Sequence, residues 1–286
     1  MEGLEWQSVQ ADMSPESDFP PTKCRLKYLV CTTPRSGSWL LCTGLAATGQ
    51  AGRPAEFFTP VYGQAYRARL GLTRLVPVQY WNFLLEHRTS PNGVFGMKIH
   101  FDQMEKFFPN EQAQKQFLAR FDRLIFLTRR DKLAQAVSFW KARATGVYRM
   151  TANTVADSLP SPSVYYRFGD IAHALALLAT REQRWLSLLS HFADRTFSLD
   201  YEDLAGNYGQ SLERALIALG LGVAVSAIDP QPRVLPQRDH VNEEWERLFV
   251  EDLRGSAAQR IVRLAAANTD AQRPYGDLLA PHEQQA

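Results

Sequence analysis

Short apolar segments that suit buried strands alternate along the chain with stretches in which apolar residues recur at helical spacing. The strand-like segments lie at 28–31, 94–100, 122–128 and 196–201. The helix-like stretches lie at 40–48, 62–90, 102–121, 133–140, 170–192, 204–219 and 242–254. Alternation of this kind is typical of domains in which helices cover a parallel sheet, so we expect an α/β fold.

Polar segments bound this pattern at both ends. Residues 1–23 are polar and end near Pro20–Pro21, which predicts an N-terminal tail or an arm that straps the domain. We expect residues 24–266 to form one domain and the polar residues 267–286 to form a C-terminal tail. Residues 145–168 contain Gly, Pro and several Ser, which predicts a long loop of the kind that covers a site or binds an acceptor.

Composition narrows the functional class. The 286 residues are 45% hydrophobic and 22% charged, as in soluble globular enzymes, and a net charge of +2 does not indicate nucleic-acid binding. The three cysteines are scattered and odd in number, which favours a reducing, cytoplasmic location over a disulfide framework or a zinc site. The N-terminal residues lack the pattern of a signal peptide, and no apolar run reaches the roughly 20 residues that span a bilayer.

The polar loop Thr32–Ser38, between the first strand and its helix, has the composition of an anion site. Unpaired N–H groups at a helix start bind phosphate, Gly37 lets the backbone approach, and Arg35 adds a charged fork. A Walker A site is excluded, because no Lys-Ser or Lys-Thr pair follows Gly37. An ordinary strand-to-helix turn capped by Ser36 or Ser38 explains the same residues.

Three further candidate site residues are Glu56, Lys98 and His100. Glu56 precedes two aromatic residues, and partial burial there would raise the pKa of its carboxyl and suit a general base. A surface glutamate beside an apolar anchor is the alternative. Lys98 and His100 share one face of the second strand, near the sheet edge where ligands bind. A snorkelling lysine and a packed or capping histidine are the alternatives.

A second strand-to-helix junction carries the basic cluster Arg129–Lys132. Ser138 lies eight residues after Arg130, or about 12 Å along an ideal helix, so both reach one anion only if the arginine extends along the helix. This spacing indicates a second anion site, although a solvated helix cap explains the cluster on local grounds.

Taken together, these separated stretches resemble the bacterial trehalose 2-sulfotransferase-like family, within the wider sulfotransferases. The resemblance covers residues 26–254 and rests on YLVCTTPRSGSWLL, AGRPAEFF, PNGVFGMKIH, RLIFLTRRDKLAQAVSFWKA and QRDHVNEEWERL. It implies a P-loop-like α/β fold, with a central parallel sheet of about four to five strands flanked by helices.

The resemblance also implies a reaction: transfer of a sulfuryl group from 3′-phosphoadenosine 5′-phosphosulfate (PAPS) to a hydroxyl of a carbohydrate, glycolipid or other small metabolite. The product would be 3′,5′-bisphosphoadenosine (PAP), and no metal is expected. The donor's 5′-phosphosulfate would bind Arg35, Ser36, Gly37, Ser38 and Trp39, and its 3′-phosphate would bind Arg130 and Ser138.

Glu56 matches the position proposed as general base in that family, and His100 is the alternative base because other sulfotransferases use a histidine close after a lysine. Arg35 and Lys98 are expected to stabilise the charge that builds on the leaving oxygen. The resemblance further implies a homodimer, with the acceptor near the subunit interface.

This sequence departs from the family pattern at three positions. Trp39 stands where Thr is frequent, which removes a hydroxyl contact to the donor. Arg53 and Ala55 stand where acidic and Gln residues are expected, which changes the acceptor pocket. Two other functions remain alternatives: a P-loop-type kinase or NTPase, and a non-catalytic module that keeps the nucleotide fold and binds a partner.

Overall fold

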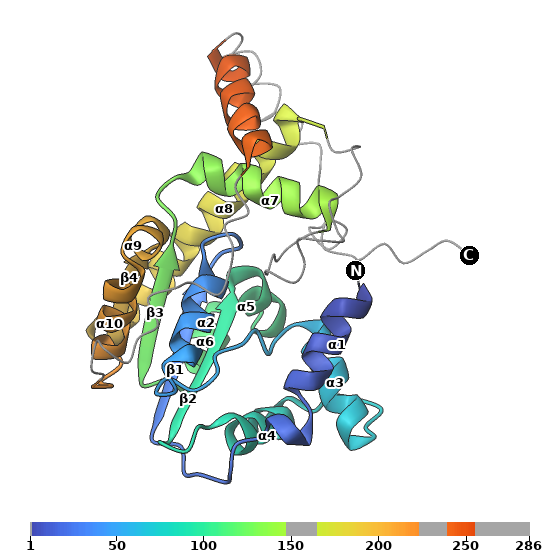
Figure 1. Ribbon diagram of the computed structural model, residues 1–286, viewed down its shortest axis with the longest axis vertical. Coiled ribbons are helices and arrows are strands. Elements are labelled where there is room, and N and C mark those ends of the chain that lie inside the picture. The colour runs from blue at the N-terminus through green and yellow to red at the C-terminus, as the bar shows by residue number, and fades with distance from the viewer. Residues whose placement is uncertain (1, 147–164, 223–238, 255–286) are drawn as a thin grey trace.

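The computed structural model describes residues 2–146, 165–222 and 239–254, which are drawn as ribbons in Figure 1. Most of the loop expected at 145–168 lies outside the described residues, as does the expected C-terminal tail at 267–286. Within the described part of the chain, no helix is long and apolar enough to cross a membrane.

Among the described residues, four strands form a central parallel sheet in the order β2-β1-β3-β4. Its strands are β1 (Leu26–Thr32), β2 (Val94–His100), β3 (Arg123–Thr128) and β4 (Thr196–Asp200). This sheet confirms the predicted α/β fold and strand number. Because β1 pairs with β2 on one side and with β3 on the other, the order of successive strands reverses beside β1. In open parallel sheets, ligands bind at such a switch point, outside the carboxyl ends of the strands.

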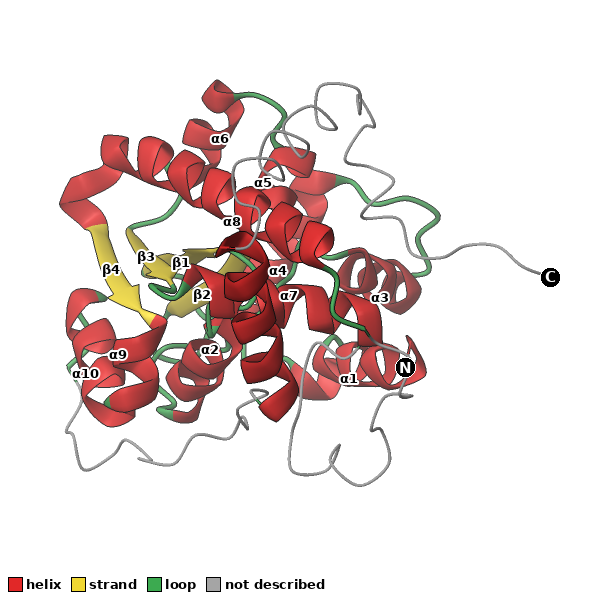
Figure 2. Ribbon diagram, turned by 90° about the horizontal axis from the view of Figure 1, so that it is seen from above, coloured by secondary structure: helices red, strands yellow, loops and turns green. Residues whose placement is uncertain are grey.

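Helices cover both faces of the sheet (Figure 2). Alternation along β1 sends Leu29 and Cys31 into one core and Tyr28 and Val30 into the other. The first core is closed by α3 (Pro60–Leu70), α4 (Pro77–Arg88), α5 (Phe101–Phe107), α6 (Glu111–Leu118) and α8 (Phe168–Leu189). The second is closed by α2 (Ser38–Ala47), α9 (Tyr201–Gly206) and α10 (Tyr208–Ala218).

Helix α7 (Lys132–Thr145) follows β3 and packs with α8 and a helix over residues 240–254 around a third core. That core contains Val137 from α7, Leu178 from α8 and Phe249 from the last helix. The 3-10 helix η2 (Ser190–Arg195) joins α8 to β4.

Two stretches predicted as single helices are each divided. The stretch 102–121 forms α5 and α6, because Pro109 disfavours helical backbone at Phe108 and Asn110 caps the new helix by accepting a hydrogen bond from Ala113 N. The stretch 204–219 forms α9 and α10, which meet at Asn207, where φ is −137°.

The N-terminal residues form an arm against α3 and α4, made of α1 (Glu2–Asp12), η1 (Pro15–Ser17) and the residues up to β1. In Figure 1 α1 lies beside α3. Val9 and Met13 are buried in the first core, although the surrounding sequence is polar. Asp18 then forms ion pairs with Arg69 and Arg88, so the arm is fastened by a carboxylate as well as by apolar contacts.

Candidate active site

The loop Thr33–Gly37 joins β1 to α2 at the switch point of the sheet. Gly37 precedes the first turn of α2 with a φ of 81°, in the left-handed region that glycine tolerates. A Cβ on Gly37 would lie 2.4 Å from Cδ2 of Tyr201, so the tyrosine ring packs directly against the loop backbone. Arg35 also has a positive φ, 64°, which is uncommon for a residue with a side chain and marks a locally strained turn.

Hydrogen bonds from three other elements hold this loop. The Thr32 hydroxyl donates to Leu127 O at 2.8 Å and contacts the Ser36 hydroxyl, and Ser36 donates to Thr33 O at 2.9 Å. The buried Gln135 side chain on α7 donates to Pro34 O at 2.7 Å and to the Thr33 hydroxyl at 3.0 Å. The buried Ser36 side chain therefore stabilises the turn through these hydrogen bonds.

Trp185 on α8 donates from its indole nitrogen to Thr32 O at 2.8 Å. This contact places the C-terminal part of α8 beside the carboxyl end of β1. Hydrogen bonds from side chains of α7 and α8 consequently hold the loop in place.

Two arginines converge on the loop. Arg35 Nε donates to the Ser138 hydroxyl on α7 at 2.9 Å. Arg129, the residue after β3, donates from Nη1 to Arg35 O at 3.4 Å, and its guanidinium stacks 4.7 Å from the centre of the Tyr201 ring. The Nε of Arg129 is buried and has no hydrogen-bond partner among the described residues, so a donor group is available for an anionic ligand at this point.

The Arg130 side chain points toward carboxylates outside the loop. Its guanidinium lies 2.9 Å from carboxylate oxygens of both Asp200 and Asp203 and 3.9 Å from Glu202, and its side chain is 55% exposed. Its contacts are with the residues at the end of β4 and the start of α9. Ser138, its predicted companion, instead contacts Arg35.

A second group of polar residues surrounds Glu56. Residues before Glu56 run along the edge of β2, where Ala55 O accepts a hydrogen bond from Lys98 N at 2.9 Å. Lys98 Nζ lies 2.5 Å from Glu56 Oε2, and His100 Nε2 lies 3.4 Å from the same oxygen. The Gln103 side chain donates to the other oxygen, Oε1, at 2.5 Å. The structure thus brings Glu56, Lys98 and His100 together.

Electrostatics set the charge of Glu56. Burial raises the pKa of its carboxyl, as the sequence predicted, but the positive charge of Lys98 and the hydrogen-bond donors of Lys98 and His100 outweigh burial. The net effect holds the pKa well below its usual range, opposite to the expected direction. Glu56 is therefore ionised while this ion pair holds, and Lys98 must shift for it to become a strong base.

The loop and the Glu56 group meet at Trp39. Lys98 Nζ lies 5.9 Å from the centre of the Trp39 ring, within reach of a cation–π contact. This proximity follows from the sheet, because Lys98 is paired in register with Val30 and shares its face, which is the face covered by α2. The two groups of predicted residues consequently form one site.

Sequence reasoning missed three residues that shape this site, and it named a fourth, Arg129, within the basic cluster Arg129–Lys132 without selecting it as a donor-binding residue. Gln103 donates a hydrogen bond to Glu56. Arg129 and Tyr201 contact the loop backbone, and Gln135 donates hydrogen bonds to the loop. Arg129 was detectable as the residue directly after a strand. Gln103 carried a weaker signal, its place in the first turn of the helix after β2. Tyr201 and Gln135 reach the loop only through tertiary contacts.

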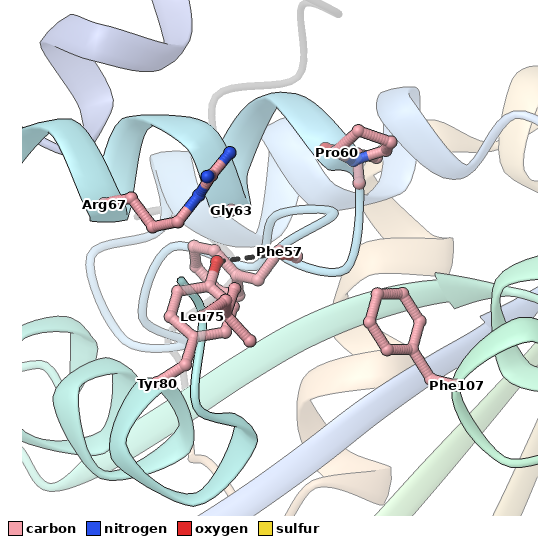
Figure 3. A pocket seen from close by; sticks show the side chains of 8 residues that line it. Phe57, Pro60, Gly63, Arg67, Leu75, Tyr80 and Phe107 are labelled. Atoms are coloured by element: carbon pink, nitrogen blue, oxygen red, sulfur yellow. Dashed lines mark hydrogen bonds between the residues drawn. The ribbon is translucent and has the colours of Figure 1, made fainter. Parts of the chain in front are cut away.

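An apolar pocket of about 260 Å³ opens beyond Phe57, between α3, α4 and α5 (Figure 3). Tyr80 forms part of its wall and donates from its hydroxyl to Phe57 O at 2.8 Å. Arg67 is the charged residue of its lining. None of the predicted site residues lines the pocket. Phe57, which does line it, directly follows Glu56 in the sequence, so the pocket lies next to the Glu56 segment. Among the residues that the structure describes, no group of three potential ligands could hold a metal ion.

Comparisons with known proteins identify the family. The model of the Stf0 sulphotransferase family matches residues 27–252. Trehalose 2-sulfotransferase of Mycolicibacterium smegmatis is 29% identical over 259 residues, covering 79% of this chain and 94% of that protein. Its namesake in Mycobacterium tuberculosis is 27% identical over 252 residues, covering 76% of this chain and 92% of that protein.

Among solved structures, the sulfotransferase domain from the curacin biosynthetic pathway aligns with a TM-score of 0.49 and 16% identity, covering 77% of this chain and 80% of that one. The family match covers the sheet, the loop at Gly37 and the residues around Glu56, and it confirms the resemblance seen in the sequence. The chain belongs to the Stf0 sulphotransferase family.

Proposed function

We propose that the protein transfers a sulfuryl group from PAPS to a hydroxyl of a carbohydrate such as trehalose, of a glycolipid or of another small metabolite. Family membership supports the reaction class, and the two relatives named trehalose 2-sulfotransferase support a sugar acceptor. The observation that carries the proposal is the meeting of a strand–loop–helix anion site with a Lys98–Glu56 ion pair across Trp39.

The donor would be held by the loop and its neighbours. Backbone N–H groups at the start of α2 and the Arg35 side chain suit the 5′-phosphosulfate, with the contributing residues Arg35, Ser36, Gly37, Ser38 and Trp39. Ser138 and an arginine suit the 3′-phosphate. Arg130 is the arginine that the sequence indicated, but Arg129 has the contact to the loop and the buried, unpartnered Nε, so we favour Arg129.

The donor, when bound, supplies an activated sulfuryl group and a phosphate as the leaving group. Glu56 would take the proton of the acceptor hydroxyl through a carboxylate oxygen. Lys98 and Arg35 would stabilise the negative charge that develops on the leaving oxygen. Trp39, beside Lys98, would help to exclude water from the ion pair, and His100 is the alternative proton acceptor.

This arrangement makes the state of the base depend on Lys98. While Lys98 Nζ stays 2.5 Å from Glu56, the carboxylate is a weak base, because protonation would break the ion pair. An anion that draws Lys98 away raises the pKa of Glu56 and strengthens it as a base. His100, 3.4 Å from the same oxygen, remains to orient the carboxylate.

Arg53 and Ala55, the two residues whose identity suggested a changed acceptor pocket, have defined contacts in the structure. Arg53 donates to Ser17 O at 3.1 Å and stacks 4.3 Å from the Phe19 ring, so its charge faces the N-terminal arm. Ala55 lies on the edge of β2 opposite Met97.

A homodimer and a cytoplasmic location are part of the same proposal. The family resemblance suggests the homodimer, which sedimentation can test, and the cysteine content suggests the location, which cell fractionation can test.

Calorimetric titration with PAP, compared with ADP, in excess chelator tests the donor. We expect metal-free binding of PAP and much weaker binding of ADP, because ADP lacks the 3′-phosphate. Preference for ADP in the presence of magnesium would refute the proposal and favour a kinase-like function. Sulfate transfer from labelled PAPS to trehalose, detected by mass spectrometry, then tests the acceptor.

A further inference from the structure

Gln103 occupies the third position of α5 and contacts two neighbours of the proposed site. Its Nε2 donates to Glu56 Oε1 at 2.5 Å, and its Oε1 accepts a hydrogen bond from His100 N at 3.0 Å. The backbone N–H of His100 can only donate, so the amide oxygen of Gln103 must face it. The amide nitrogen therefore has to face Glu56, and the orientation of the Gln103 side chain is fixed by chemistry.

The two carboxylate oxygens of Glu56 have different partners. Oε2 contacts Lys98 at 2.5 Å and His100 at 3.4 Å, both of which can carry charge. Oε1 contacts the neutral amide of Gln103. A neutral amide does not change its charge when a ligand arrives, so the Oε1 contact persists while Lys98 moves away from Oε2.

We propose that Gln103 is a positioning residue for sulfuryl transfer, which anchors Oε1 of Glu56 and thereby presents Oε2 to the acceptor hydroxyl on the side of Lys98. This inference rests on the proposed function, because it assigns Glu56 the role of base. Without the anchor, withdrawal of Lys98 leaves the carboxylate with the longer contact of Oε2 to His100, which lets it rotate about its side chain. Gln103 then acts through Glu56 and touches neither donor nor acceptor.

Substitution Gln103→Leu removes the amide and keeps a similar volume. We expect kcat to fall roughly 10- to 100-fold, as for loss of a hydrogen bond to a charged group, with PAP affinity unchanged within twofold. Loss of a donor to the ionised form also raises the pKa of Glu56. The acid limb of the kcat profile should therefore move to higher pH.

Gln103→Glu supplies a second test with nearly the same shape. It places two carboxyl groups in contact, which raises the pKa of the pair and moves the acid limb further than Gln103→Leu does. Among the described residues, the polar groups that contact Glu56 are Lys98 and His100 from β2 and Gln103 from α5. The shift can therefore be assigned by combining Gln103→Glu with His100→Ala.

Gln114 on α6 provides a matched control. It is a glutamine, 4% exposed, whose side-chain nitrogen likewise donates one hydrogen bond, to Phe108 O at 2.9 Å. Gln114→Leu removes one amide hydrogen bond away from Glu56 and should leave kcat and the acid limb unchanged. An equal loss in Gln114→Leu and Gln103→Leu would overturn the positioning role.

A readout independent of turnover is ¹³C NMR of labelled glutamate carboxyls, with the Glu56 signal assigned from Glu56→Gln. We expect the Glu56 titration midpoint to rise in Gln103→Leu and to stay constant in Gln114→Leu. An unchanged midpoint together with wild-type kcat in Gln103→Leu would refute the inference. If the wild-type protein neither binds PAP nor transfers sulfate, the proposed function fails and the role of Gln103 in transfer fails with it. An inert Gln103→Leu in an active enzyme would remove only the present inference.

Discussion

Arg129 and Arg130 are adjacent in sequence but have different surroundings, and separate replacement of each tests the donor site. Arg129 contacts the carbonyl of Arg35 and stacks on Tyr201. Arg130 is exposed and paired with Asp200 and Asp203. If the local contacts determine function, Arg129→Ala should weaken PAP binding and Arg130→Ala should not.

The size of the expected change in PAP affinity follows from the contacts of each arginine. The buried Nε of Arg129 has no partner among the described residues, so a phosphate there would gain at least one charge-assisted hydrogen bond. Loss of such a bond costs about 1.5–3 kcal/mol, which raises the Kd for PAP roughly 10- to 150-fold. Arg130 is 55% exposed and its ion pairs are screened, so its removal should change Kd less than about threefold at physiological salt.

Isothermal titration with PAP and with 5′-AMP separates the 3′-phosphate from the rest of the nucleotide. The loss in Arg129→Ala should appear with PAP and be absent with 5′-AMP, and Arg129→Lys should recover only part of the affinity, since lysine lacks the planar fork. A tenfold or greater loss in Arg130→Ala, with Arg129→Ala near wild type, would refute this reasoning and restore the assignment made from spacing.

Three further predictions concern the base, the loop and the arm. Glu56→Gln should lower kcat at least 100-fold and leave PAP affinity within threefold in calorimetry, and equal losses in both would make Glu56 structural. Gly37→Ala should abolish measurable PAP binding, because the new methyl group would meet Tyr201 and strain a φ of 81°, and Tyr201→Ala should restore part of that binding if the clash is the cause. Asp18→Asn should lower the free energy of unfolding by about 3 kcal/mol in urea titrations, because Arg88, 2% exposed, loses its carboxylate partner. The pKa of Asp18 is lowered by Arg69 and Arg88 against the opposing effect of burial, so the wild type should hold this stability above about pH 4 and lose it as the pH falls toward the lowered pKa, whereas Asp18→Asn should show a flatter acid dependence.

The sequence was most informative where local pattern determines structure. The strand predicted at 94–100 has the same bounds in the structure, because its apolar residues and the preceding Asn92-Gly93 turn define both ends. The alternation of β2 also placed Lys98 and His100 on one face, as the structure shows. The ends of helices were harder to predict, because the breaks at Pro109 and Asn207 lie inside stretches of continuous helical spacing.

Properties that depend on several elements were not predictable. The direction of the Glu56 pKa shift required the distance to Lys98, which no spacing rule provides across more than forty intervening residues. The same holds for Gln103, whose role appears only when α5 lies against the edge of β2. Arg130 and Arg129 could not be distinguished by spacing, because Arg130 is directed by carboxylates at the end of β4 and the start of α9, whereas Arg129 is directed by Arg35 O and the Tyr201 ring.

The N-terminal arm lies before residue 27, where the family match begins, yet it contacts the segment that carries Glu56. Arg53, three residues before Glu56, binds Ser17 O and Phe19, and Asp18 fastens the same part of the arm to Arg88. The ordering of the arm and the ordering of the segment that carries Glu56 are thus linked equilibria. Linkage is reciprocal, so a ligand that tightens the Glu56 segment must protect the arm from hydrogen exchange by the same free energy with which the arm strengthens binding of that ligand.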